Sequence, residues 1–444
     1  MYVQIGSGLI LVALSAFFIR EALWLAIVFL AVWSFGPLIA DWISRPIRSG
    51  EKLAEEDTAF LRNAALKTWR YYADFCGARE NWLPPDNYQK QPFKGLAHRT
   101  SPTNIGLLLA CLTAGWDFGY LSSSQLLCRV ENTLNTIDRL EKMNGQLFNW
   151  YDTRTLAPLS PRFISTVDNG NFVCLLIAVK QALLSLPGEK RPELRMLSGV
   201  RDVLAQLGRE TEKIDSLLAA GAPRAEILAV LPDIRKSTTA NDYWSQTLRE
   251  MIDCIAGGAE LSADGGQVAA LAGRIDRLVS ESDFSFLYNT KRRLFSVGYN
   301  VEEKSQINSY YDLLATEARQ TSFIAVAKGD VPERHWFRLS RELVLGGGGA
   351  ALVSWTGTMF EYLMPLLLMR SAPTTLLGRT YQNAVRCQIA YGKKRGHAVW
   401  GVSECAFYSF DRELNYQYKA LGTPKLALKR DTHVDYVVSP YSSC

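Results

Sequence analysis

The chain has few of the residues that build metal centres or disulfide scaffolds. Its 444 residues include 4 histidines, none of them paired at the spacing of metal ligands, which argues against a zinc site. The 8 cysteines form no CxxC pair and follow no regular spacing, so they indicate reduced thiols and a cytosolic environment. We therefore expect a protein that works without a metal ion or another cofactor.

The chain also lacks long runs of one charge. Its formal net charge is only +5, and the aromatic residues stand beside Asn, Asp and Pro rather than within basic stretches, so nucleic acid is not an expected partner. With 48% apolar and 21% charged residues, the composition is that of a folded protein with one large core or two medium ones. The absence of a βαβ rhythm argues against a parallel sheet.

The N-terminal segment differs from the rest because it is almost entirely apolar. Two runs, Val3–Ile19 and Ala22–Ala40, are separated only by Arg20 and Glu21, and each is close to the length of about 20 residues that spans a bilayer. A signal peptide fits poorly, because there is no basic start and no small-residue cleavage site. We predict a transmembrane region over residues 1–45, either as two spans or as one long, bent segment. The positive residues Arg45, Arg48 and Lys52 favour a cytoplasmic location for the rest of the chain.

The remainder, residues 46–440, reads as an all-α domain. Apolar stripes at helical spacing and capping signals such as Ser122 with Gln125 predict its helices. The predicted helices cover residues 52–76, 103–113, 122–143, 171–185, 241–256, 308–327, 359–370 and 376–391, and strand-like alternation is confined to short pieces such as 292–301. Residues 186–282 are charged and lack the unusual residues found elsewhere, so they are interpreted as a peripheral helical insertion.

Blocks that mix aromatic residues with Asn, Asp, Arg and Thr fall at the predicted helix ends. Phe148–Arg154 and Ser165–Asn171 are the most pronounced of them. Helical hairpins whose loops converge on one end are the arrangement of an α/α toroid. Aromatic faces beside hydrogen-bonding side chains suit a sugar, which has a CH-rich face and a rim of hydroxyls. The residues predicted to bind it are Trp82, Asp86, His98, Arg99, Trp150, Tyr151, Asp152, Arg154, Asp168, Asn169, Asn171, Tyr311, Asp312, Trp355, Trp400 and Tyr416.

Each of these residues also has a plainer interpretation. The tryptophans could belong to the core, and His98 could cap or brace the helix that comes after it. Gly346–Gly349 lacks the Lys and Ser/Thr of a phosphate-binding loop, so it is interpreted as a flexible loop at the rim of a pocket.

Glycosidic chemistry needs two carboxylates, and three glutamates are candidates. Glu404 stands among apolar residues, which should raise its pKa and suit it to donating a proton. Glu317 lies within a predicted helix beside Arg319, and Glu361 lies between Phe360 and Tyr362. The plainer interpretation of each glutamate is a helix cap or a salt bridge.

Several motifs in the same order resemble the cyclic β-1,2-glucan synthases. They include Asn81–Asn87, Ala97–Gly106, Phe148–Arg154, Ser165–Asn171, Lys328–Asp330 with His335–Arg338, Phe360–Pro365 and Trp400–Glu404. The resemblance is to the glycoamylase-like middle region of that family and covers essentially residues 30–440. It implies an (α/α)6-toroid domain at a bacterial inner membrane. It also implies partnership with a UDP-glucose glycosyltransferase module and a phosphorylase-like module, so the chain is interpreted as a fragment or a split gene product.

The same resemblance implies that linear β-1,2-glucan is closed into rings by retaining transglycosylation. Glu317 would then be the nucleophile, Glu404 the acid/base, and Glu361 a reserve candidate. Retention predicts carboxyl groups about 5–5.5 Å apart, whereas about 6.5–9.5 Å would indicate inversion. Two alternatives stay open at this point. One is an endo-β-1,2-glucanase, and the other is a non-catalytic glucan-binding scaffold for a membrane glycosyltransferase.

Overall fold

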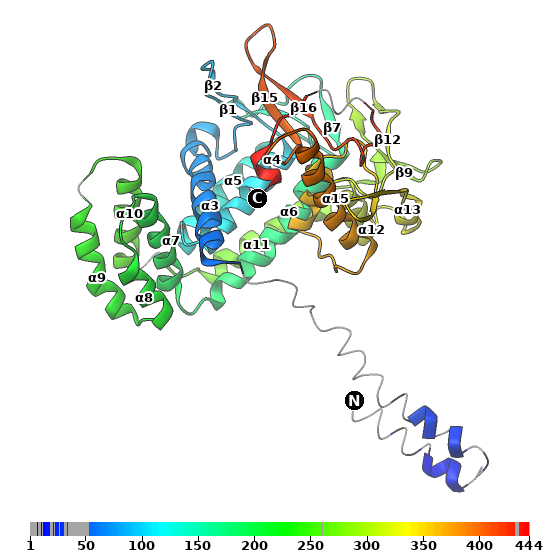
Figure 1. Ribbon diagram of the computed structural model, residues 1–444, viewed down its shortest axis with the longest axis horizontal. Coiled ribbons are helices and arrows are strands. Elements are labelled where there is room, and N and C mark those ends of the chain that lie inside the picture. The colour runs from blue at the N-terminus through cyan, green and yellow to red at the C-terminus, as the bar shows by residue number, and fades with distance from the viewer. Residues whose placement is uncertain are drawn as a thin grey trace. The chain divides into compact units, whose positions relative to one another are not determined.

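The computed structural model describes scattered residues between 7 and 33, and residues 53–443 except 239, 259–260 and 431–434. These fall into two compact units, Met1–Glu55 and Glu56–Cys444. Most of the two predicted N-terminal apolar runs therefore lies outside the described residues. The larger unit carries the helices and strands that build the core and the candidate site (Figure 1).

The larger unit is mostly helical, which confirms the predicted class in its coarse form. Its longer helices are α3 (Glu55–Phe75), α4 (Pro102–Asp117), α5 (Ser123–Arg139), α6 (Thr166–Ser185), α7 (Pro192–Gln206), α8 (Glu212–Ala220), α9 (Arg224–Ser237), α10 (Tyr243–Gly257), α11 (Gly265–Glu281), α12 (Arg319–Lys328) and α15 (Leu376–Lys394). The short helices α13 (Arg334–Arg338) and α14 (Met359–Leu363) complete the set. The capping box of Ser122 and Gln125 at the start of α5 is confirmed.

Helix α6 lies at the centre of the main core, packed against α4, α11 and α12 (Figure 1). Two glycines permit this close packing. A Cβ at Gly106 of α4 would lie 2.8 Å from Leu175, and a Cβ at Gly170 of α6 would lie 1.8 Å from the Thr321 hydroxyl. Among the described residues, one helical stretch, Thr166–Gly188, has the length and apolar composition to span a membrane, and it contains α6. Half of it is buried inside the protein.

The segment predicted as an insertion contributes to two different apolar clusters. Helices α7, α8, α9 and α10 share one cluster, which includes Val200, Ile227 and Ile252 and is joined by Leu66 of α3 and by Tyr120. Helix α11 instead places Leu271 and Ile275 in the main core. The helices of residues 192–257 therefore pack together, whereas residues 265–281 belong with α6.

The strands form small antiparallel ladders between the helices. The pairs are β1 (Tyr88–Gln89) with β2 (Gly95–Leu96), β3 (Arg99–Thr100) with β6 (Tyr151–Asp152), β4 (Lys142–Met143) with β5 (Gln146–Leu147), β13 (Leu343–Gly346) with β14 (Gly349–Leu352), and β15 (Glu404–Phe410) with β16 (Tyr416–Ala420). Two ladders have three strands. In one, β10 (Gly298–Asn300) lies between β11 (Ser305–Gln306) and β7 (Phe163–Ser165). In the other, β9 (Leu294–Ser296) lies between β12 (Tyr310–Tyr311) and β8 (Tyr288–Asn289).

The structure corrects two local predictions. Residues 308–327 are not one helix, because β12 and a run of turns occupy residues 310–318 and α12 begins only at Arg319. The glycines at 346–349 are not a loop at a pocket rim. They form the tight turn of the β13–β14 hairpin, where Gly347 and Gly348 have φ of 62° and 87°, and Gly347 lies against the backbone of Asn383 in α15.

Candidate active site

Three glutamates line one cavity of about 280 Å³ in the larger unit. Glu317 comes from the turn before α12, Glu361 from the first turns of α14, and Glu404 from the first residue of β15. The rings of Tyr311 and Trp355 form part of the wall. Segments that are far apart in the sequence thus place several carboxyl groups beside aromatic faces, which is the arrangement that glycosidic chemistry needs.

Glu361 is held rigidly by donors from its own loop. Its carboxylate accepts hydrogen bonds from the hydroxyls of Ser354 (2.8 Å), Thr356 (2.7 Å) and Thr358 (3.2 Å). It also accepts from the backbone N–H groups of Trp355, Thr356 and Thr358 at 3.1–3.2 Å. The last of these donors completes a capping box with Thr358. Glu361 is therefore fixed in position and caps α14.

Glu317 has the opposite environment. Its Oε2 atom is buried and has no hydrogen-bond partner among the described residues. Burial, followed by the charges of Glu361 and Glu404, raises the pKa of Glu317 from 4.5 to about 8. At neutral pH this carboxyl group holds its proton, and Glu317 lines the cavity, which makes it a candidate for the chemistry of the site.

Glu404 lies between these extremes. Burial, and then the charge of Glu361, raises the pKa of Glu404, while a hydrogen bond from Tyr418 lowers it. The Tyr418 hydroxyl donates to Oε2 at 3.1 Å, and the Tyr441 hydroxyl donates to the backbone oxygen of Glu404 at 2.8 Å. The tyrosine donor favours the ionised form, so Glu404 gives up its proton more readily than a buried carboxyl group without such a donor.

The buried guanidinium of Arg319 joins the segments that carry Glu317 and Glu361. Its Nη1 donates to the carbonyl oxygens of Thr316 (2.9 Å) and Glu361 (3.1 Å), and its Nη2 donates to the carbonyl oxygen of Tyr362 (2.7 Å) and the hydroxyl of Tyr381 (3.0 Å). The side chain is only 1% exposed. Arg319 thus fixes the position of both acids through the backbone, and its partners in these contacts are neutral.

Tyr311 and Asp168 lie within electrostatic reach of the catalytic candidates. Burial, followed by the charges of Glu317, Asp168 and Glu404, raises the pKa of Tyr311 well above its ordinary range. Asp168, in the first turn of α6, accepts a 2.7 Å hydrogen bond from the Thr103 hydroxyl. Of the predicted sugar-binding residues, Tyr311 and Trp355 line the cavity and Asp168 stands near it.

A second group of predicted residues forms a cluster of its own outside the cavity that holds the glutamates. Arg99 pairs with Asp86 at 3.0 Å, and its guanidinium carbon lies 4.9 Å from the ring centroid of Trp150. Arg99 is exposed, whereas Asp86 and Trp150 are half-buried. Their contact with sugar stays a prediction.

Other predicted residues are engaged in holding the loops together. His98 does not cap α4, because Ser101 does so and His98 contacts Glu80 at 2.9 Å instead. Asn169 exchanges hydrogen bonds with the backbone of Leu147. Further protein contacts are made by Asn171 with Gln320 and Thr103, by the Tyr151 hydroxyl with the Glu141 carbonyl, and by Asp152 with the N–H groups of Arg154 and Thr155. These hydrogen bonds favour a structural role for them.

The remaining predicted residues are spread over the unit. The Asp312 backbone oxygen accepts from Ser340, the Tyr416 hydroxyl donates to the Gln91 carbonyl, and Trp400 packs near Gly392. The side chain of Arg154 is exposed, and Trp82 lines a hollow on α5. Their contact with sugar stays a prediction.

Sequence reasoning missed Thr356, which lines the cavity, and Tyr418, which touches Glu404. Both stand in segments that mix aromatic residues with hydrogen-bonding side chains, Ser354–Glu361 and Asn415–Tyr418. The sequence could therefore indicate these segments but not the individual residues. The contact of Tyr418 with Glu404 depends on the β15–β16 pairing, which places Tyr418 opposite Ala406.

The fold is that of glycoside hydrolases acting on β-1,2-glucan and of glycoamylase-like proteins. The endo-β-1,2-glucanase of Chitinophaga pinensis, solved with sophorotriose and glucose, superposes with a TM-score of 0.54 at 14% identity, over 85% of this chain and 76% of that one. The endo-β-1,2-glucanase of Talaromyces funiculosus, solved with sophorose, gives 0.56 at 12% identity, over 87% of this chain and 72% of that one. The Glycoamylase family model matches residues 309–444.

Sequence similarity narrows this class further. The cyclic β-(1,2)-glucan synthase NdvB of Rhizobium meliloti is 36% identical across 100% of this chain, which spans 17% of that protein's length. The chain is thus a homologue of one segment of a cyclic β-(1,2)-glucan synthase.

The raised pKa of Glu317 predicts a dependence of stability on pH. Between 4.5 and about 8 the folded protein binds a proton at Glu317 that the unfolded chain has released, so stability falls as pH rises through that window, by at most about 1.4 kcal/mol per pH unit. Glu317→Gln should remove this slope and raise the urea midpoint more at pH 8 than at pH 5.

The matched control for this measurement is Glu413→Gln, because Glu413 is exposed on the β15–β16 turn. It should show the wild-type pH profile. Equal midpoint shifts for Glu317→Gln at pH 5 and pH 8 would contradict the prediction.

Proposed function

We propose that this chain processes β-1,2-glucan at the cavity of Glu317, Glu361 and Glu404. The carrying observation is that two carboxyl groups of raised pKa, Glu317 and Glu404, line one cavity beside the rings of Tyr311 and Trp355. The similar proteins, a cyclic β-(1,2)-glucan synthase and two endo-β-1,2-glucanases, support β-1,2-linked glucose as the substrate. The (α/α)6-toroid arrangement predicted from the sequence remains part of this proposal.

The reaction that we propose is ring closure by retaining transglycosylation. A carboxylate attacks the anomeric carbon of a glucose unit within the chain, and the β-1,2 bond breaks as the leaving 2-oxygen takes the proton of the other carboxyl group. The 2-hydroxyl at the non-reducing end of the same chain then attacks the glycosyl–enzyme bond and returns its proton to that group. Two inversions preserve the β configuration, and no water is consumed.

The electrostatics favour the two roles in the opposite sense to the family resemblance. Glu317, with its pKa raised to about 8, carries the proton that the leaving oxygen needs. Glu404 receives the Tyr418 hydroxyl, which stabilises a carboxylate ready to attack. We therefore propose Glu317 as the acid/base and Glu404 as the nucleophile. Glu361 then acts as a positioning anion that helps to hold the proton on Glu317.

Product analysis tests the reaction. Incubation of the detergent-solubilised protein with linear β-1,2-glucan should yield rings, each lighter by one water than the linear chain of equal length in a mass spectrum. Glu317→Gln and Glu404→Gln should each lower the rate by at least about a hundredfold, the minimum expected when an acid/base group is lost.

Glu302→Gln is a suitable control, because Glu302 lies at the surface in a salt bridge with Arg162, and its rate should equal that of the wild type. Shortened linear chains that take up one water from the solvent would support an endo-β-1,2-glucanase instead. Binding of glucan without turnover by the intact protein would favour a scaffold.

Azide rescue separates the two roles. With an aryl β-sophoroside whose leaving group needs no protonation, Glu317→Ala in azide should give a β-glycosyl azide, because azide replaces the acceptor in the second step. Glu404→Ala should give the α-azide by direct displacement. The reverse pattern would assign Glu317 as the nucleophile, as the family resemblance implies, and no azide product from either variant would count against a retaining mechanism.

We also propose that the N-terminal residues attach the protein to a bacterial inner membrane, with the catalytic unit cytoplasmic and glycosyltransferase and phosphorylase-like modules as partners. In the smaller unit Phe17 is 90% exposed and Trp24 63% exposed, and large exposed apolar side chains need an apolar partner.

Extraction with alkaline carbonate tests the attachment: the intact protein should stay in the membrane pellet, and a variant that begins at residue 53 should be released. Protease added outside intact spheroplasts tests the orientation, and it should leave the intact protein uncut. Release of the intact protein by carbonate would contradict attachment.

A further inference from the structure

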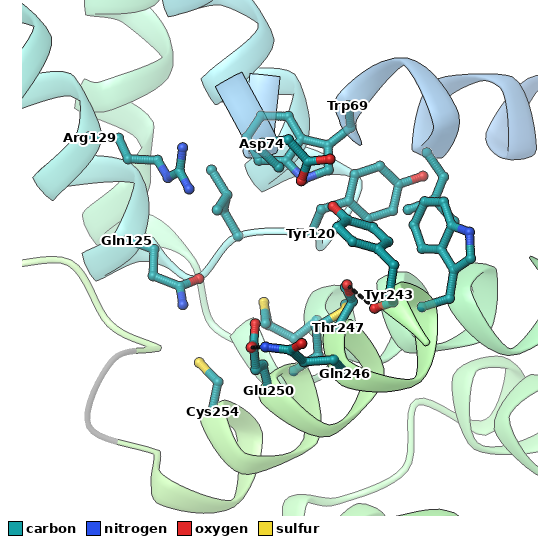
Figure 2. A pocket seen from close by; sticks show the side chains of 16 residues that line it. Trp69, Asp74, Tyr120, Gln125, Arg129, Tyr243, Gln246, Thr247, Glu250 and Cys254 are labelled. Carbon is teal, nitrogen blue, oxygen red and sulfur yellow. Dashed lines mark hydrogen bonds between the residues drawn. The ribbon is translucent and has the colours of Figure 1, made fainter. Parts of the chain in front are cut away.

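Another cavity, of about 320 Å³, lies among helices that contribute nothing to the glutamate cavity. Figure 2 shows Trp69 and Asp74 entering it from α3, Gln125 and Arg129 from α5, and Tyr243, Gln246, Thr247 and Glu250 from α10. Small-molecule sites occupy about 300–1,000 Å³, so this cavity is at the small end of that range. Its walls combine aromatic rings with hydrogen-bonding side chains.

Arg129 gives the cavity an unsatisfied donor. Its Nη1 atom is buried without a hydrogen-bond partner in the described part of the chain, and its guanidinium carbon lies 5.9 Å from the Trp69 ring centroid. A guanidinium keeps its charge in proteins, so a buried N–H without an acceptor is costly. An oxygen atom of a ligand in the cavity would satisfy it.

A neighbouring hollow, also of about 320 Å³, shares Gln125 and Arg129 with the first cavity and is bounded by Trp82. Trp82 has φ of 60°, a left-handed conformation that is strained for a bulky residue. The hydroxyl of Thr133 holds it in place by donating to the Trp82 carbonyl oxygen at 3.1 Å. Trp82 and Arg129 both line this hollow, and strained backbone of this kind is enriched at ligand sites.

The charges in the first cavity are balanced, which favours a neutral ligand. Arg129 and the nearby Arg70, whose guanidinium carbon lies 4.0 Å from the Tyr243 ring centroid, oppose Asp74 and Glu250. The two acids are also engaged. Asp74 accepts from Arg70 at 3.1 Å, and Glu250 accepts from Gln246 at 2.9 Å. The cavity therefore has the chemistry of binding rather than of bond cleavage.

We propose that the two hollows on either side of Arg129 form a second glucan-binding site, in which sugar hydroxyls bind Arg129 and Gln125 and sugar faces stack on Trp69 and Trp82. Carbohydrate fits because it is neutral, rich in hydroxyls, and has apolar faces that aromatic rings cover. The inference rests on the proposed function for the identity of the sugar. The site holds a stretch of substrate away from the acids that cut it.

Calorimetric titration tests this site with sophorose, the β-1,2-linked glucose disaccharide, as the probe. The host is the full-length Glu317→Gln protein, in which turnover is suppressed. Two classes of site are expected. Arg129→Met should weaken one class about ten- to hundredfold, the loss expected for a hydrogen bond to a charged group, and leave the other class unchanged. Trp355→Ala should have the converse effect.

Arg139→Met is the matched control, because Arg139 lies on the same helix, lines neither hollow, and donates to Asn81 at 3.3 Å. Its binding should equal that of the host protein. Thermal melting of each variant shows that it is folded, and Arg129→Lys, which keeps the charge, provides a second, milder variant at the same position.

The outcomes separate this inference from the proposed function. If folded Arg129→Met and Arg129→Lys both bind sophorose as the host does, the second site is wrong while the glutamate cavity stands. If Arg129→Met removes all binding and Trp355→Ala removes none, the second site stands and the glutamate cavity is not a glucan site. An absence of sophorose binding in the host and in the wild type would overturn both.

Discussion

The candidate site depends on one buried cation, Arg319. Its guanidinium has taken no carboxylate as partner and instead binds three carbonyl oxygens and one hydroxyl, from Thr316, Glu361, Tyr362 and Tyr381. Hydrogen bonds to a charged group contribute about 1.5–3 kcal/mol each, which offsets the cost of burying the charge. Because Arg319 binds both segments at once, it ties the turn of Glu317 to the start of α14.

Around that unit the three acids differ in their hydrogen-bond donors. Glu361 accepts from three hydroxyls on Oε2 and from N–H groups on both oxygens. Glu404 accepts from one tyrosine, and Glu317 has an oxygen without any partner among the described residues. The three carboxyl groups of one cavity thus have different environments. Glu361 is held in place by its donors, the pKa of Glu404 is raised by burial and lowered by its tyrosine donor, and Glu317 carries a proton. Burial is the main cause of the raised pKa of Glu317 and Glu404, and the negative charge of Glu361 adds to it at both.

The sequence predicted those parts of the structure that local signals determine. The stripe and capping box of α5 were found because both lie within one helix, and the three glutamates were singled out by their neighbours and by the family resemblance. The β15–β16 hairpin and the strand at Tyr310–Tyr311 were not predicted, because their pairing joins residues that no periodicity relates. The roles of Asn169 and Asn171 depended on partners in β5, α4 and α12, which only the folded chain brings near.

Glu361 caps a helix of only five residues and at the same time lends its charge to the cavity. Any replacement of it therefore removes a fold-stabilising contact and an electrostatic one together. In a mutational scan, position 361 would therefore score as indispensable whether or not its carboxylate takes part in catalysis. Intolerance to substitution alone does not identify a catalyst at this site.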